Sequence, residues 1–175
     1  AGYGINKKDN WVFLMQQKFY EEGKSIKLIN SSVSGDTTGG GLGRLAKNLK
    51  KFNPDFVLIE LGGNDALRGY SINLIKSNLE KMIALAKQNK SKVLLMQIRI
   101  PPNYGQKYTH AFEKIYVDLA QTEEVYLLPF MLEEIGINSE LMQPDGIHPN
   151  KKAQPQIAKE MKKNIDKFLL FNQSN

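Results

Sequence analysis

Residues 54–65 read "PDFVLIELGGND", an almost unbroken apolar run that ends in two glycines followed by Asn64 and Asp65. A continuous apolar run bounded by a turn signal is typical of a strand that is buried on both faces of a sheet. Parallel sheets contain such strands because helices cover both of their faces. The stretch therefore predicts a parallel strand whose carboxyl end carries a polar turn.

The remaining segments alternate between helical and strand patterns. Apolar residues at helical spacing predict helices over residues 10–23, 71–89, 109–121 and 150–170, a short helix near 131–135, and a glycine-rich loop that enters a helix over 35–52. Shorter apolar runs predict strands over residues 25–32, 54–63, 91–100 and 125–130, with a loop over 101–108. This alternation, without a repeat or a linker, predicts a single α/β domain with a mainly parallel sheet.

The beginning of the chain departs from this class. The sequence starts at Ala1 rather than Met, and "AGYGINKK" at residues 1–8 leads directly into a helix, whereas an α/β fold normally begins with a strand. We therefore expect residues 1–175 to form one domain that is N-terminally incomplete, with its first strand absent from this sequence.

The composition narrows the classes of function. The chain has 175 residues, of which 41% are hydrophobic and 24% are charged, and this fits one globular domain with its own core. It has no cysteine and only two histidines, so we expect neither a disulfide nor a bound metal. We also expect no other cofactor. No apolar run approaches the ~18 residues of a membrane-spanning helix, so we expect no transmembrane segment.

The net charge of +6 favours anionic ligands or surfaces, and nucleic acid is the obvious partner to test. The lysines, however, are spread along helical segments, with no aromatic residues interleaved and no binding motif. The sequence therefore predicts no nucleic-acid partner.

Polar residues follow the predicted strands at their carboxyl ends, where ligands bind to open parallel sheets. These ends carry Gly35, the turn at 62–65, the segment 99–108 and the loop 145–148. We therefore expect these four segments to meet at one edge of the sheet.

The loop "DGIHPN" at residues 145–150 holds Asp145 three residues before His148. On a tight turn, this spacing lets a carboxylate reach one ring nitrogen, which fixes the tautomer of a general base and leaves the other nitrogen for the cleft. The alternative is an Asp that caps a helix beside an incidental surface His. The second histidine, His110, sits inside a helix pattern beside Phe112 and is the weaker candidate.

The turn "LGGNDALRG" at residues 61–69 offers Asn64, whose side-chain amide can donate a hydrogen bond to a developing oxyanion. The alternative is an ordinary strand-to-helix turn with local hydrogen bonds, and Asp65 fits a structural cap better than an acid. The backbone N–H of Gly35 is a second candidate oxyanion donor. The glycines at 39–43 lack the ending of a phosphate-binding P-loop, so the sequence argues against nucleotide binding.

Four stretches resemble, in this order, the sequence blocks of the SGNH (GDSL-type) hydrolases: "SVSGDTT" (32–38), "ELGGNDALRG" (60–69), "LLMQIRIPPNYG" (94–105) and "DGIHPN" (145–150). Within that family the chain is most similar to the bacterial enzymes that hydrolyse acyl-CoA thioesters, lysophospholipids and aryl esters. The resemblance runs from Ala1 into the last helix. It implies a flavodoxin-like three-layer α/β/α fold with a mainly parallel sheet, and hydrolysis of acyl esters and thioesters.

By this resemblance a Ser-Asp-His triad performs the reaction, with His148 as the base, Asp145 as its orienter, and Gly35 and Asn64 as oxyanion donors. The family's nucleophile is the first Ser of a Gly-Asp-Ser-Leu-Ser segment that ends the first strand. The match puts this Ser three residues ahead of Ala1. We therefore expect residues 1–175 alone to be inactive and poorly stable, because they lack the nucleophile and an interior strand.

The serines within the chain fit the nucleophile less well. Ser34 adjoins Gly35 in the loop that the family sets opposite the nucleophile, and Ser31 and Ser32 end a predicted strand without a Gly-x-Ser-x-Gly elbow. The alternative function is a non-catalytic module that binds acyl groups or lipids and keeps the pocket without a nucleophile.

The resemblance also suggests where substrate binds. Leu67, Ile100, Pro101 and Tyr104 offer apolar surface in loops that the family uses for substrate. The alternative is that Pro101 and Pro102 only stiffen a turn. We expect a monomer that binds an acyl ester, an acyl-CoA or a lysophospholipid, and the family implies a periplasmic or secreted location.

Overall fold

The computed structural model describes residues 1–173, and the chain divides into two compact units. The sheet unit is Gly35–Phe130, and the helical unit combines Ala1–Ser34 with Met131–Asn175. The expectation of a single, N-terminally incomplete domain over residues 1–175 stays a prediction.

Among the described residues, the sheet unit contains three parallel strands in the order β1-β2-β3, with Val57 opposite Val93 and Leu95 opposite Leu127. Its elements are α2 (Thr38–Phe52), β1 (Phe56–Ile59), α3 (Gly63–Leu67), α4 (Ile72–Gln88), β2 (Lys92–Met96), the 3-10 turn η2 (Pro102–Tyr104), α5 (Gln106–Thr122) and β3 (Tyr126–Leu128). Helices separate the strands because a parallel neighbour can be reached only by a crossover connection. The predicted α/β class with a parallel sheet is confirmed.

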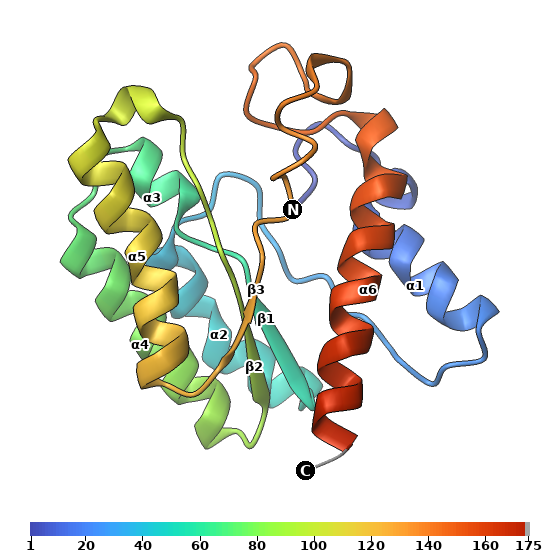
Figure 1. Cartoon of the computed structure of the whole chain (residues 1–175). Coiled ribbons are helices and arrows are strands. Elements are labelled where there is room, and N and C mark those ends of the chain that lie inside the picture. The colour runs from blue at the N-terminus through green and yellow to red at the C-terminus, as the bar shows by residue number, and fades with distance from the viewer. Residues whose placement is uncertain (174–175) are drawn as a thin grey trace. The chain divides into compact units, whose positions relative to one another are not determined.

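Helices α2, α4 and α5 lie along one face of this sheet (Figure 1). Because side chains alternate along a strand, Val93 and Leu95 of β2 share one face of the sheet, and both belong to the core that these helices form. The helices contribute residues at helical spacing: Leu45, Leu49, Ile75, Leu79, Ile83, Phe112, Ile115 and Leu119. Burying such a side chain stabilises a protein by roughly 1.5–3 kcal/mol relative to leaving it exposed.

Burial differs between β1 and β2. Strand β2 is buried from Val93 to Met96, as a continuous apolar run predicts. In β1, however, Phe56 is 39% exposed, and Val57 and Leu58 are only partly buried. The expectation that this strand is buried on both faces is wrong for the described residues, because β1 forms an edge of their sheet whereas β2 has a strand on each side.

The helical unit is built from α1 (Trp11–Glu21) and α6 (Gln154–Gln173), which pack against each other (Figure 1). The short 3-10 turns η1 (Lys7–Asp9), η3 (Ser139–Leu141) and η4 (Lys151–Ala153) belong to the same unit. Asn10 begins α1, since its side chain accepts a hydrogen bond from the Val12 amide at 2.9 Å. None of the helices in residues 1–173 combines the length and apolar character needed to cross a membrane.

Four charged side chains link the end of α1 to α6. Lys162 Nζ lies 2.7 Å from both Glu22 and Asp166, and Lys24 Nζ lies 2.7 Å from Asp166 and 3.2 Å from Glu22. The hydrogen bond from Lys162, followed by that from Lys24, lowers the pKa of Glu22. Both ammonium groups also lie over the buried Phe19 ring. Single exposed ion pairs contribute little to stability, so the network matters through its geometry, which fixes the end of α1 on α6.

Residues 25–32 do not form the predicted strand. A strand needs a neighbour that supplies a ladder of backbone hydrogen bonds, and none of the described strands pairs with this segment. The side-chain amide of Gln16 in α1 takes the place of a neighbouring strand at one point. It accepts a hydrogen bond from the Leu28 backbone N–H at 2.6 Å and donates one to the Ile26 carbonyl at 2.8 Å. The segment has no regular structure, and Ile29 is 41% exposed.

The helix predicted near residues 131–135 is also wrong, since these residues form consecutive turns. One helix-like hydrogen bond, from the Gly136 amide to the Leu132 carbonyl at 2.8 Å, closes a single turn. Glycine is a poor helix former, so the turn at Gly136 is not extended into a helix.

Gly62 lies in a closely packed turn after β1. Its φ of +117° favours glycine, and a Cβ at this position would lie 2.2 Å from the Tyr116 hydroxyl. That hydroxyl donates to the Leu61 carbonyl at 2.9 Å, and burial raises the pKa of Tyr116. We expect Gly62→Ala to lower the free energy of unfolding by roughly 2–4 kcal/mol, through backbone strain and the disturbed hydrogen bond.

Chemical denaturation measures this loss, with Gly43→Ala as the matched control. Gly43 lies inside α2, and a Cβ there would meet nothing within 4 Å. The control variant should therefore gain roughly 0.5–1 kcal/mol from its higher helix propensity. Equal effects of the two substitutions would contradict the close packing around Gly62.

Candidate active site

Asp145 and His148 form a closed turn in the helical unit. Oδ2 of Asp145 lies 2.8 Å from Nδ1 of His148, and Oδ1 accepts hydrogen bonds from the amides of Ile147 and His148 at 2.9 and 3.0 Å. Gly146 permits this turn, because its φ of +66° is one that other residues rarely adopt. The spacing of three therefore brings the carboxylate and the imidazole together.

The surrounding hydrogen bonds stabilise the charged form of Asp145. The amide of His148 contributes most, followed by its imidazole and the amide of Ile147, and together they lower the pKa of Asp145 to about 2. A carboxylate that accepts from Nδ1–H keeps the proton of the neutral ring on that atom. Nε2 is then the basic nitrogen, which is the arrangement that a general base requires.

The alternative in which Asp145 caps a helix is wrong. The next helical turn, η4, is capped by Asn150, whose side chain accepts from the Lys152 amide at 2.9 Å. The carboxylate contacts of Asp145 are instead those of the turn 145–148. Although Asp145 lies shortly before a helix, its carboxylate therefore binds His148 and does not cap that helix.

Two neighbours of His148 could not be found from the sequence. The Tyr3 ring packs on the imidazole, with ring centroids 4.6 Å apart. Gln143 binds the segments of both Tyr3 and His148. Its side-chain Nε2 donates to the carbonyls of Tyr3 and Pro149 at 2.8 and 3.1 Å, and its backbone N–H donates to the His148 carbonyl at 2.7 Å. Tyr3 and His148 lie almost the whole chain apart, so no local spacing could have linked them.

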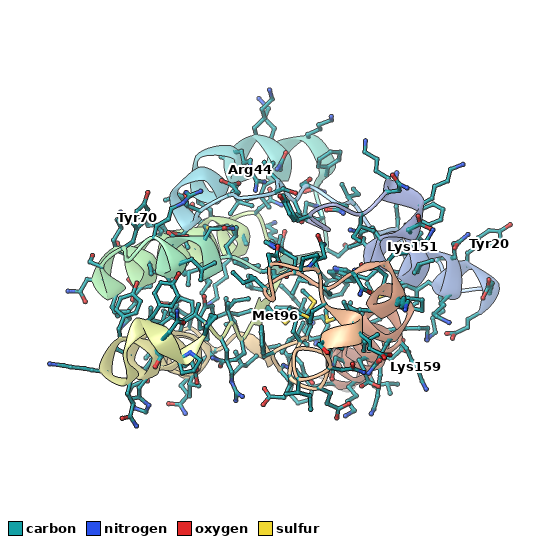
Figure 2. The ribbon with its side chains drawn as sticks, turned by 90° about the horizontal axis from the view of Figure 1, so that it is seen from above. Tyr20, Arg44, Tyr70, Met96, Lys151 and Lys159 are labelled. Atoms are coloured by element: carbon teal, nitrogen blue, oxygen red, sulfur yellow. The ribbon has the colours of Figure 1, made fainter. Side chains whose placement is uncertain are left out.

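In the sheet unit, Asn64 binds the residue that follows Gly35. Asn64 Nδ2 donates to the carbonyl of Asp36 at 3.0 Å, and the Gly35 carbonyl accepts from Arg68 Nη2 at 3.1 Å. The Asp36 carboxylate in turn pairs with Arg44, which lies on α2 (Figure 2). A side-chain amide nitrogen carries two hydrogens, so Asn64 keeps a second N–H that can donate. The loop that contains Gly35 is thus held from α2 by Arg44 and from the region of α3 by Asn64 and Arg68.

Asp65 follows Asn64 but is sealed from solvent, with 1% of its surface exposed. Its oxygens accept from the Thr38 amide at 2.8 Å and the Thr38 hydroxyl at 2.5 Å. Thr38 begins α2, where the helix dipole favours a negative charge. These contacts agree with a structural cap and leave Asp65 without access to a substrate.

The four residues predicted to bind substrate divide into two pairs. Ile100 is 8% exposed and belongs to the hydrophobic core, and Leu67 packs against that core. Pro101 and Tyr104 are exposed, Tyr104 to 37%. Hydrophobicity in the sequence could not separate these pairs, because core residues and binding residues are equally apolar.

The second histidine, His110, is an exposed residue of α5. It belongs to the sheet unit, whereas Asp145 and His148 belong to the helical unit. Among residues 1–173, no three His, Asp or Glu side chains gather as the ligands of a metal ion would.

These arrangements define a class of protein. An imidazole oriented by Asp is the base of enzymes that activate a hydroxyl nucleophile. A side-chain amide placed after a parallel strand, as Asn64 is after β1, can donate a hydrogen bond to an oxyanion. With the parallel α/β sheet, they fit a hydrolase. The chain matches the model of the GDSL-like Lipase/Acylhydrolase family over residues 1–154 and belongs to this family.

Similar proteins agree with this assignment. The chain is 46% identical over 169 residues to an arylesterase of Vibrio mimicus, covering 97% of this chain and 84% of the relative. It is 43% identical over 165 residues to Thioesterase 1/protease 1/lysophospholipase L1 of Escherichia coli (strain K12), covering 94% and 78%. The crystal structure of the psychrotrophic esterase EstA from Pseudoalteromonas sp. aligns with a TM-score of 0.95 and 41% identity over 97% of this chain and 92% of that one. The predicted family and fold class are confirmed, and the chain is an ester hydrolase.

The lowered pKa of Asp145 predicts how its turn responds to acid. Hydrogen bonds from the turn lower this pKa from 3.8 to about 2, so the stabilisation that they provide is complete above about pH 4 and is lost as the pH falls through 2. We expect the difference in unfolding free energy between the native protein and Asp145→Asn to be constant at neutral pH and to shrink below about pH 4. Urea denaturation at a series of pH values measures it. A difference that is unchanged down to about pH 2 would contradict the hydrogen-bonded carboxylate.

Proposed function

We propose that the protein hydrolyses acyl thioesters and lysophospholipids as well as acyl esters, through a covalent acyl-enzyme. The observation that carries this proposal is the 2.8 Å contact between Asp145 Oδ2 and His148 Nδ1, because an oriented imidazole can take the proton of a hydroxyl nucleophile. The names of two relatives, an arylesterase and a thioesterase with lysophospholipase activity, support the range of substrates. They also argue against a non-catalytic binding module.

In the proposed reaction, His148 Nε2 takes the proton of a serine hydroxyl while the serine oxygen bonds to the acyl carbon. The carbonyl oxygen becomes an oxyanion, which accepts hydrogen bonds from the Gly35 amide and the Asn64 side chain. Collapse of this intermediate breaks the bond to the alcohol or thiol, which leaves with the proton from His148. Water then repeats the two steps on the acyl-serine, releasing the carboxylic acid and restoring the serine.

We propose that the nucleophile is a serine three residues ahead of Ala1. The packing of Tyr3 on the His148 ring supports this, because that serine is five positions before Tyr3 and five residues span at most about 18 Å, so it can reach the imidazole. Ser34 is the competing candidate, but it adjoins Gly35, the proposed oxyanion donor. Residues 1–175 alone are therefore expected to show no serine-dependent turnover.

The acyl chain is proposed to contact Pro101 and Tyr104, which are exposed, with Leu67 and the buried Ile100 supporting them from the core. We propose that the enzyme acts as a monomer and, from the family resemblance, that it is periplasmic or secreted. Gel filtration and fractionation of the producing cells test these two proposals.

The two histidines provide the sharpest test of the proposed base. In the protein that includes the residues ahead of Ala1, His148→Ala should lower kcat on p-nitrophenyl acyl esters by about a millionfold, the typical loss when a triad acts as a unit. His110→Ala, the matched control on the exposed face of α5, should leave kcat unchanged. Comparable losses at both positions would mean that the base is misassigned. Turnover that disappears with EDTA and returns with zinc would contradict the metal-free mechanism.

The exposed pair of substrate residues can be tested by acyl-chain length. Tyr104→Ala should lower kcat/KM on a dodecanoyl ester by roughly tenfold and leave an acetyl ester unchanged, because it removes apolar contact with only the longer chain. Tyr20→Ala is the control, since Tyr20 is 83% exposed at the end of α1 (Figure 2). Effects of Tyr104→Ala that are uniform across chain lengths would count against this role.

A further inference from the structure

Asp65, Thr38 and Asn78 form a buried polar chain beside the two proposed oxyanion donors. Thr38 is fully buried, and Asp65 and Asn78 are 1% and 9% exposed. Asp65 accepts from the amide and hydroxyl of Thr38 at 2.8 and 2.5 Å, and the same hydroxyl accepts from Asn78 Nδ2 at 3.0 Å. The chain thereby links α3, α2 and α4.

Simple packing does not account for this chain. Burying a carboxylate is costly unless it is hydrogen-bonded, and apolar side chains of similar volume usually hold helices together at least as well. Hydrogen bonds differ from apolar contacts because they are directional. The polar chain therefore specifies how α2 and α3 are oriented, beyond holding them in contact.

The neighbouring contacts show which segments are oriented. Asn64 donates to the Asp36 carbonyl and Arg68 to the Gly35 carbonyl, so residues 64, 65 and 68 all bind the backbone of the segment 35–38. Arg68 is exposed and Asn64 is partly buried, whereas Asp65 is shielded from water. Hydrogen bonds are stronger where water is excluded, so Asp65 is the anchor of the three.

We propose that Asp65, acting with Thr38 and Asn78, is a positioning residue that fixes the Gly35 amide relative to the Asn64 side chain. This inference rests on the proposed function, in which these two groups stabilise the oxyanion. Preorganised donors act at a defined distance, and a displacement of about 1 Å can cost 10²-fold in rate. The effect should fall on kcat, because the donors act mainly in the transition state.

Asp65→Asn tests the proposal, because it keeps the shape of the side chain but replaces one acceptor with a donor. In the enzyme that includes the residues ahead of Ala1, we expect kcat for p-nitrophenyl acetate to fall about 10- to 100-fold, with KM changed by less than about threefold. Thr38→Val removes only the hydroxyl contacts and should act in the same direction. Thr38→Ser keeps the hydroxyl and should retain the native kcat. Should Asp65→Asn fail to fold, the comparison of these two Thr38 variants carries the test.

Ser91→Ala is the matched control. Ser91 is 3% exposed and donates to the Pro54 carbonyl at 2.6 Å, so its substitution removes a buried hydrogen bond of the same kind. It immediately precedes β2, at the amino end of the sheet, whereas Asn64 follows the carboxyl end of β1. Ser91→Ala should lower stability and leave kcat unchanged.

A double variant separates positioning from general loosening. Asn64→Ala alone should lower kcat by roughly 10²–10³-fold, and Asp65→Asn should have a clearly smaller effect in that background, because one of the donors it positions is gone. The positioning role is overturned if Asp65→Asn and Thr38→Val act on kcat no more than Ser91→Ala does, or if the effect of Asp65→Asn is undiminished beside Asn64→Ala. If Asn64→Ala itself leaves kcat unchanged, the proposed oxyanion role fails and this inference fails with it.

Discussion

The parallel pairing of β2 with a strand on each side is the constraint on which the sheet unit depends. Parallel neighbours cannot be joined by a tight turn, so the chain passes from β1 to β2 through α3 and α4, and from β2 to β3 through α5. Right-handed crossovers that advance in one direction put their helices on one face, which explains why α4 and α5 share a core with Val93 and Leu95. The same pairing directs the turn after Ile59 and the loop after Met96 to one edge of the sheet.

Much of the fold could be predicted from the sequence because its strongest patterns are local. The run that became β2 is buried as its apolar residues indicate, and Asn10 caps α1. The strand prediction for residues 25–32 is wrong because a strand depends on a partner elsewhere in the chain, and this segment instead makes two hydrogen bonds with the Gln16 side chain. The exposure of Phe56 has the same origin, since an edge position cannot be read from the residues of one strand.

The candidate site likewise has contacts that the sequence indicates and contacts that it does not. The pairing of Asp145 with His148 follows from a spacing of three with a glycine between them, so the sequence is sufficient. The contacts of Tyr3 and Gln143 with the His148 segment join distant parts of the chain, and no periodicity indicates them. Ile100 is an apolar loop residue that turned out to belong to the core, because its position after β2 directs it inward.

The claim that Gly35 and Asn64 receive the negative charge of the intermediate is tested most directly by a crystal structure of the active enzyme after reaction with a phosphonate ester. Phosphonates bond to the nucleophile and present a tetrahedral centre with a negatively charged oxygen. The phosphorus should be bonded to a serine ahead of Ala1, with one phosphonyl oxygen within about 3.1 Å of both Gly35 N and Asn64 Nδ2. Phosphorus bonded to Ser34, or an oxygen that contacts neither donor, would contradict the assignment.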